Sequence, residues 1–231
     1  MKKNTVAADF QIAQKKSFML LLIDESGSMG SIQNETIQTY QSIVEKIYDN
    51  RQEFKDLEQY ICLWTFGSHI KEIIPPTLVS STNFPEFSYH PMGFTPLYDA
   101  IGIATKELEA FIHQHAHAGE YLVNVNIITD GLENSSKEYT AFDIKKIVER
   151  LETRNWVFQY FGADHDVEKV SHQLSIKNKQ RFYKTAESMN HVACYSNYTT
   201  SYNIKKWLHE SDDDFKDLYD RTNPVSLHQK Q

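Results

Sequence analysis

Oxygen-bearing side chains follow two predicted strands of this sequence, at the points where the strands end. Asp24-Glu25-Ser26-Gly27-Ser28 comes directly after the apolar run that ends at Ile23, and Asp130-Gly131 follows a predicted strand that ends at Thr129. Thr95 stands just before an apolar stripe with helical spacing. Hydroxyl and carboxylate oxygens are the hard donors that Mg²⁺ prefers in an octahedral shell. If the fold brings these hydroxyls and carboxylates to one place, they predict a divalent-cation site.

Each of these groups also has an ordinary structural role. Thr95 before Pro96 suits a helix N-cap followed by proline at the first helical position. Ser26 and Ser28 suit a loop or a cap, and Asp130-Gly131 suits a plain turn. A site is the better interpretation only if three separate segments meet at one edge of the fold.

The elements that must position these residues alternate between strand and helix patterns. The run from Phe18 to Ile23 is continuously apolar, which is typical of a central parallel strand buried on both faces. Gly67-Ser68 predicts a hairpin connection, and Pro75-Pro76 should end the returning edge strand. The predicted strands lie at 18–23, 60–66, 69–74, 122–129, 156–161 and 181–183, and the predicted helices at 32–48, 97–112, 144–151, 167–174 and 187–198.

This order predicts an α/β fold, Rossmann-like and doubly wound. Its sheet is six-stranded and mostly parallel, with one antiparallel edge strand and helices on both faces. Ligands of such folds bind beyond the carboxyl ends of the strands. The loops expected to surround the ion are therefore 25–34, 77–95, 131–138 and 163–166.

In this arrangement the sequence resembles the von Willebrand factor A (VWA) domain family, in particular its small stand-alone bacterial and phage-type members. The resemblance covers 17–198 and rests on the segments 24–30, 95–100 and 130–135, with Phe161-Gly162-Ala163 before an acidic pair. It implies a VWA domain at 17–198, between an N-terminal arm (1–16) and a C-terminal extension (199–231) that is a helix or an acidic tail.

The resemblance also implies a metal-ion-dependent adhesion site with all five positions present. Ser26 and Ser28 would bind the ion directly, and Thr95 directly or through water. Asp24 and Asp130 would act mostly through water and orient the hydroxyls. The expected ion is Mg²⁺, with Mn²⁺ or Ca²⁺ as alternatives.

Two carboxylates roughly neutralise a divalent ion, which then keeps a coordination position for an incoming carboxylate. The expected function is a divalent-cation-dependent protein–protein interaction module without catalysis, whose partner contributes an Asp or Glu. Similar stand-alone proteins are often encoded beside ATPases, kinases or phosphatases in bacterial stress or phage-conflict systems. We expect Met29, Phe94 and Tyr98 to be exposed and to provide apolar contacts around the bound carboxylate.

Two other classes compete with this function. A Mg²⁺-dependent phosphohydrolase would use Asp24, Asp130 and His165. The sequence contains neither a Walker-type phosphate loop nor a Gly-x-Ser-x-Gly elbow, and the three motif segments contain no Arg or Lys to bind phosphate. In the third class, a structural subunit, the ion would only rigidify the loops.

Several further polar residues have more than one interpretation. His113 and His117 would share a helix face, but a helix C-terminus is an ordinary place for histidine. The segment 164–166 suits a helix cap or part of a partner surface, and Glu133 and Asn134 suit loop positions or an outer shell of the site.

Composition excludes some functions. The chain has 231 residues, 24 Lys+Arg against 31 Asp+Glu and a formal net charge of −7, so nucleic acid is not expected as the main ligand. The longest apolar run, 18–23, is far shorter than the ~20 residues of a membrane span, and no apolar signal region follows Met1. The chain has only two cysteines, Cys62 and Cys194, which fits the reducing cytoplasm, so we expect a cytoplasmic protein. We expect no membrane partner, and the sequence leaves the oligomeric state open.

Overall fold

The computed structural model describes residues 14–79, 87–163 and 167–209. These residues form a six-stranded sheet in the order β3-β2-β1-β4-β5-β6. The strands are β1 (Lys16–Asp24), β2 (Glu58–Phe66), β3 (Ile70–Leu78), β4 (Tyr121–Thr129), β5 (Trp156–Ala163) and β6 (Asn178–Phe182). All neighbours pair in parallel except β3, which is antiparallel to β2 at one edge. The predicted fold class is confirmed.

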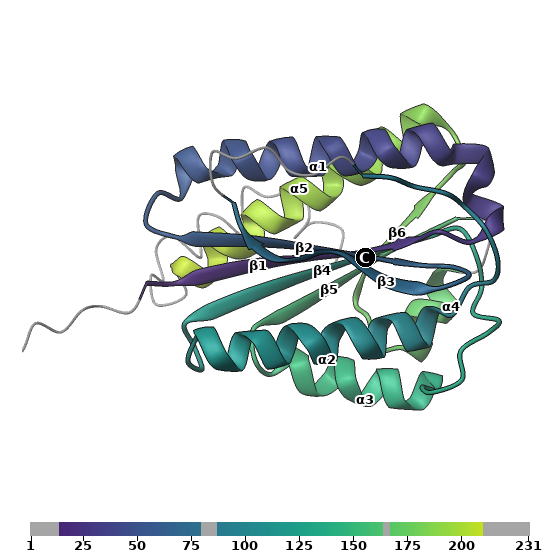
Figure 1. The fold of residues 1–231 in the computed structure, drawn as a ribbon. Coiled ribbons are helices and arrows are strands. Elements are labelled where there is room, and N and C mark those ends of the chain that lie inside the picture. Colours follow the sequence, from purple (N-terminus) through teal and green to yellow (C-terminus); the bar gives the residue numbers. More distant parts are fainter. Residues whose placement is uncertain (1–13, 80–86, 164–166, 210–231) are drawn as a thin grey trace, which may run out of the picture.

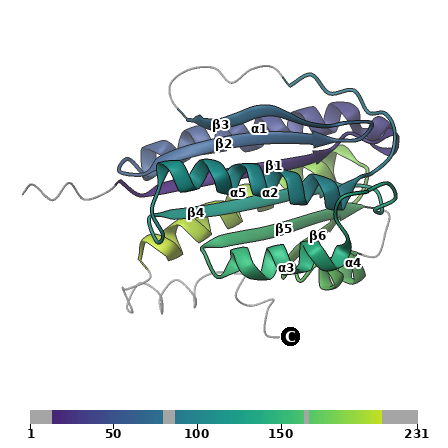
Figure 2. The ribbon, with the colours of Figure 1, turned by 60° about the horizontal axis from the view of Figure 1, so that its bottom comes forward.

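Helices cover both faces of the sheet. They are the 3₁₀ helix η1 (Gly27–Ile32) and the α-helices α1 (Gln33–Glu53), α2 (Leu97–His115), α3 (Ala141–Glu152), α4 (Val167–Gln173) and α5 (Ala186–Leu208). Figure 1 shows α1 and α5 on one side of the sheet and α2 and α3 on the other. Figure 2 looks past α2 onto the sheet and shows the central position of β1 and β4.

Strand β1 is the centre of the core because both of its faces are buried. Phe18, Leu20 and Leu22 pack in the cluster that includes α2 and α3. The alternate side chains from Met19 to Ile23 pack in the cluster that includes α1 and α5. Burying one such side chain stabilises the fold by about 1.5–3 kcal/mol, so β1 is held firmly and its last residue is fixed in place.

Strand β3 is longer than the sequence predicts. It continues through Pro75-Pro76 to Leu78, whereas the prolines were expected to end it. The pairing of β2 with β3 shifts register on both sides of Leu63. An edge strand tolerates proline, because one side of it has no neighbouring strand that needs its N–H groups.

Helix α5 is also longer than the predicted helix at 187–198. It continues to Leu208, and Ile204 and Trp207 pack with Phe54, Leu57 and Leu122 in a small cluster of their own. The apolar side chains of this second half explain why the helix continues. The acidic cluster Asp212-Asp213-Asp214 lies outside the described residues.

Two further expectations concern the chain as a whole. Within the described ranges, none of the helices combines the length and apolar character that crossing a membrane requires. Cys62 is buried and Cys194 is exposed, and both are free thiols.

Candidate metal centre

The candidate site lies where the two halves of the sheet meet. Asp24 is the last residue of β1, and Asp130 follows Thr129 at the end of β4. These strands are parallel neighbours, with Ile23 beside Ile128. Strands β2 and β3 lie on the β1 side of this pair, and strands β5 and β6 lie on the β4 side, so the strand order reverses direction between β1 and β4. Crevices at such switch points are the usual ligand sites of open α/β sheets.

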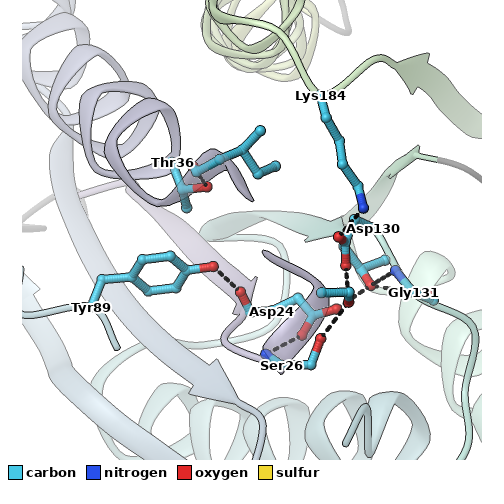
Figure 3. Close-up of polar contacts among 10 residues, drawn as sticks. Asp24, Ser26, Thr36, Tyr89, Asp130, Gly131 and Lys184 are labelled. Atoms are coloured by element: carbon cyan, nitrogen blue, oxygen red, sulfur yellow. Dashed lines mark hydrogen bonds and ion pairs between the residues drawn. The ribbon is translucent and has the colours of Figure 1, made fainter. Parts of the chain in front are cut away.

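The hydroxyls of Ser26 and Ser28 connect the ends of these strands. Figure 3 shows Ser26, Asp24 and Asp130 close together. Ser26 Oγ lies 3.1 Å from Ser28 Oγ. The hydroxyl of Ser28 donates a hydrogen bond of 2.6 Å to Asp130 Oδ1. The backbone N–H of Ser26 donates to Asp24 Oδ1 over 2.7 Å. Two hydroxyls and two carboxylates therefore form one continuous group.

Thr95 joins this group from a third segment. A Cβ atom placed on Gly131 would lie 2.9 Å from Thr95 Oγ1 and 3.7 Å from Asp24 Oδ2. The Thr95 hydroxyl and the Asp24 carboxylate therefore approach the same point, and Gly131 leaves room for both. The structure thus brings together all five residues that were expected from the sequence to form the metal site.

The hydroxyls of this group are not used to cap helices. Thr95 was a candidate N-cap, but α2 begins one residue later, with Pro96 at the cap position and no side-chain cap bond. Ser26 occupies the N-cap position of η1, yet its side chain makes no cap bond either. The capping interpretation is therefore wrong for both residues, and their oxygens remain available for a ligand.

The Asp24 carboxylate is buried. Burial raises the pKa of Asp24 to about 6, and the nearby charge of Asp130 acts in the same direction. Hydrogen bonds from Ser26 and from the Thr129 hydroxyl, the latter 2.6 Å from Asp24 Oδ2, oppose the rise in pKa. A cation beside this carboxylate would favour its ionised form. The donor set, two carboxylates and three hydroxyls, has the chemistry of a small divalent ion site.

The loop after β4 holds Thr95 in position. The backbone N–H of Thr95 donates to Asn134 Oδ1 over 2.8 Å, and the backbone N–H of Asn134 donates to the Thr95 carbonyl over 3.2 Å. Glu133 Oε2 accepts from the backbone N–H of Tyr98 over 3.0 Å. Glu133 and Asn134 therefore position the segment that carries Thr95.

Sequence reasoning missed two residues that hold the end of β1. The Tyr89 hydroxyl donates to the backbone carbonyl of Asp24 (Figure 3). Glu25 Oε1 accepts from the backbone N–H of His90 over 2.7 Å. Tyr89 is fully buried, and burial raises its pKa far above the ordinary value, so its hydroxyl stays protonated as a donor. A tyrosine within a polar loop was the only sequence signal.

Lys184 is the most important residue that sequence reasoning missed. Its Nζ lies 2.7 Å from Asp130 Oδ2 (Figure 3). The three motif segments contain no Lys or Arg, but the folded site receives this one from the connection after β6. Lys184 stands two residues beyond Phe182, so the rule that ligand sites form beyond carboxyl strand ends marks its region, but that rule does not show that its side chain reaches Asp130.

The apolar surroundings differ from the expectation. Met29 is fully buried in the core and Tyr98 is half-buried, so the prediction that they are exposed is wrong for Met29. Phe94 is 70% exposed and Leu132 is 55% exposed. These two exposed side chains stand next to Thr95 and Gly131 in sequence, and we call them the apolar rim of the site.

His113 and His117 do not form a shared site on one helix face. Helix α2 ends at His115, so His117 lies beyond it and cannot share a helix face with His113. The ring of His115 stacks on Phe111, with centroids 3.9 Å apart. Across the described ranges, no three His, Cys, Asp or Glu side chains gather closely enough to hold a metal. His165 and its acidic neighbours lie outside these ranges.

Comparison with known proteins shows the fold. No protein-family model and no curated protein matches the chain. Among solved structures, it is similar to a von Willebrand factor type A protein from Catenulispora acidiphila, with a TM-score of 0.55 and 11% identity over 82% of this chain and 43% of that chain. It is similar to proximal thread matrix protein 1 from the mussel byssus with a zinc-occupied MIDAS motif, with a TM-score of 0.55 and 13% identity over 82% and 46%. It is also similar to the manganese-loaded TRAP protein of Plasmodium vivax, with a TM-score of 0.51 and 17% identity over 78% and 73%.

These likenesses establish the fold. At identities of 11–17%, the shared feature is the VWA arrangement of sheet and helices. The chain spans less than half the length of the first solved structures that it matches, between 43% and 47%.

Proposed function

We propose that this chain, which has the fold of VWA domains, is a protein–protein interaction module that depends on a divalent cation. Asp24, Ser26, Ser28, Thr95 and Asp130 would hold the ion. A partner protein would contribute an Asp or Glu side chain to it. The observation that carries this proposal is the convergence of three hydroxyls, none of them used as a helix cap, on two buried carboxylates.

The charge and the donor chemistry favour Mg²⁺, with Mn²⁺ or Ca²⁺ as alternatives. Mg²⁺ takes oxygen ligands and keeps several waters when a site supplies few carboxylates. A bound ion would supply a Lewis acid with an exchangeable position for a carboxylate. The zinc-occupied MIDAS motif of one structurally similar protein and the manganese named for another support a divalent ion in this chain. The neutral hydroxyls orient the ion without reducing its charge.

The setting of the module is part of the proposal. The VWA domain would occupy 17–198, with an arm at 1–16 and an extension at 199–231. The motifs resemble those of stand-alone bacterial and phage-type proteins, so we place the chain in a multi-protein stress or phage-conflict system of the bacterial cytoplasm. Asp24 and Ser26 belong to one of the three segments on which this resemblance rests.

The phosphohydrolase remains the second candidate because Lys184 brings a cation to the site. This cation pairs with Asp130 Oδ2, however, so it is already engaged with a carboxylate. The hydroxyls of Ser26 and Ser28 contact each other and Asp130, an arrangement suited to ligands of an ion. We therefore favour binding over hydrolysis.

Affinity capture tests the proposed function. The immobilised full chain is incubated with lysate of its native cells in Mg²⁺ and in EDTA, and retained proteins are identified by mass spectrometry. Ser28→Ala is compared with Ser17→Ala, which changes a buried serine at the opposite end of β1. Retention of a partner should require both Mg²⁺ and Ser28. It should disappear when one surface Asp or Glu of that partner is replaced by its amide.

Two results would contradict the interaction module. If Mg²⁺ raises the melting temperature but no protein is retained in a Mg²⁺-dependent way, the ion only rigidifies the loops. If the chain releases phosphate from p-nitrophenyl phosphate with Mg²⁺ and Asp24→Ala abolishes the release, the phosphohydrolase is correct.

A further inference from the structure

We propose that Lys184 is a built-in competitor of the divalent ion, which weakens ion binding and leaves the occupied site with a net positive charge. This inference rests on the proposed function and names a residue that regulates the same site. The contact between Lys184 Nζ and Asp130 Oδ2, 2.7 Å long, is the observation that carries it.

The two oxygens of Asp130 contact two different groups, one through a hydrogen bond and the other through an ion pair. Oδ1 accepts the hydrogen bond from Ser28, on the side of the hydroxyl group. Oδ2 contacts the ammonium of Lys184. The side chain of Asp130 is 0% exposed, whereas that of Lys184 is 26% exposed. Because the carboxylate is buried, water screens the attraction between Lys184 and Asp130 only weakly. Lys184 therefore neutralises much of the negative charge of Asp130 that would otherwise attract an ion.

The backbone on both sides of Lys184 is fixed by hydrogen bonds. The backbone N–H of Tyr183 donates to Ser188 Oγ over 2.9 Å. The backbone N–H of Thr185 donates to the Tyr183 carbonyl over 2.7 Å, and the Thr185 side chain caps α5 by accepting from the backbone N–H of Ser188. Lys184 thus extends from a rigid junction between β6 and α5, and its ammonium is directed to the site by the fold.

The charges of the site explain the effect. Asp24 and Asp130 together carry two negative charges when ionised, which a divalent ion balances. With the positive charge of Lys184 added, the empty site attracts an ion less, and the occupied site carries one excess positive charge. A carboxylate from the partner brings the missing negative charge. Ion and acidic partner should therefore each strengthen the binding of the other.

A Mn²⁺ titration of the full chain, followed by the electron paramagnetic resonance signal of free Mn²⁺, tests this role. Lys184→Met should bind Mn²⁺ about tenfold more tightly than the wild type, since it removes a neighbouring like charge. Lys184→Arg keeps the charge and should stay within about twofold of the wild type. Lys184→Gln carries the same expectation as Lys184→Met and replaces it if the methionine variant does not fold.

The matched control is Lys179→Met. Lys179 lies in β6, is 30% exposed and pairs with Glu168 over 2.9 Å, so this variant makes the same change in total charge away from Asp130. Its Mn²⁺ affinity should stay within about twofold of the wild type. If it tightens as much as that of Lys184→Met, only net charge matters and the inference is overturned.

The failure of this inference differs from the failure of the proposed function. If the wild type binds one Mn²⁺ and the neutral Lys184 variants bind it equally or more weakly, Lys184 does not compete, and the interaction module is unaffected. If the wild type binds no Mn²⁺ at millimolar concentration, but Lys184→Met binds it, competition is confirmed in an extreme form. If neither binds Mn²⁺, both the inference and the metal site are wrong.

Discussion

The hydroxyl of Ser28 lies 2.6 Å from Asp130 Oδ1, although the two residues are 102 positions apart in the sequence. The parallel pairing of β1 with β4 brings them together, because the two strands end side by side. The buried side chains on both faces of β1 fix this register, since a shift by one residue would reverse the faces. The candidate site is therefore a consequence of the core.

Asp24→Asn should stabilise the metal-free protein at alkaline pH. The pKa of the buried Asp24 is about 6 in the fold against an ordinary value of 3.8, so folding favours the protonated carboxyl. This group adds stability at low pH, which is lost as the pH rises from about 4 through 6, by about 3 kcal/mol in total. Asparagine imitates the protonated carboxyl and avoids this loss.

Urea unfolding in EDTA at pH 8 and pH 4 measures the effect of Asp24→Asn. The variant should be more stable than the wild type at pH 8, and the difference should vanish near pH 4. Addition of Mn²⁺ at pH 8 should raise the stability of the wild type only. A variant that is less stable at pH 8 in EDTA would show that the charge of Asp24 is not unfavourable in the fold.

Asn134→Ala should weaken the affinity for Mn²⁺ about five- to tenfold. It removes the acceptor for the backbone N–H of Thr95 and so loosens the segment that carries this hydroxyl. Asn134→Asp keeps an acceptor oxygen and should restore the affinity. Isothermal titration with Mn²⁺ gives both values. An alanine variant within twofold of the wild type would mean that Thr95 needs no support from this side chain.

Phe94→Ser combined with Leu132→Ser should weaken the partner complex by about tenfold or more while leaving the melting temperature nearly unchanged. Both side chains are exposed at the rim of the site, so they contribute little to the core. Surface plasmon resonance with the captured partner should show faster dissociation. Phe142→Ser, an exposed residue on α3, is the control and should have no effect. Unchanged dissociation of the double variant would exclude the rim from the interface.

Glu109→Gln should destabilise the protein at pH 7 by about 1 kcal/mol, with the effect lost at acid pH. Glu109 on α2 accepts from Arg150 of α3 over 2.5 and 2.9 Å, and this contact holds the pKa of its carboxyl below the ordinary value of 4.5. The stabilisation is complete above pH 4.5 and disappears as the pH falls through the lowered pKa.

Urea unfolding at pH 7 and pH 3 tests this dependence. Asp49→Asn serves as the control, because Asp49 forms an exposed pair with Lys46 at 4.0 Å and should change stability by less than about 0.5 kcal/mol. Equal destabilisation by Glu109→Gln at both values of pH would show that its ion pair with Arg150 does not stabilise the fold.

The sequence was sufficient for those features that depend on local pattern and on general rules of chain topology. The continuous apolar run at 18–23 identified a central strand, and the alternation of elements identified the sheet. Because ligand sites form at the carboxyl ends of strands, Asp24 and Asp130 could both be predicted as metal-site residues before any distance between them was known. Thr95 could be nominated because it stands where a long loop meets a helix.

Other features depend on how side chains reach across the fold. Lys184 contacts Asp130 from the far side of β5, a relationship that no local spacing expresses. Met29 lies beside two site serines, yet the 3₁₀ helix η1 directs it into the core. Whether a proline pair ends an edge strand depends on the neighbouring strand, so the extent of β3 could not be predicted either.

Anomalous diffraction from crystals of the full chain soaked in Mn²⁺ tests the central claim most directly. The account predicts one strong manganese peak among Ser26 Oγ, Ser28 Oγ and Thr95 Oγ1, and its loss in crystals of Ser28→Ala. A well-ordered site without a manganese peak at saturating Mn²⁺, or a peak held by other residues, would contradict the account.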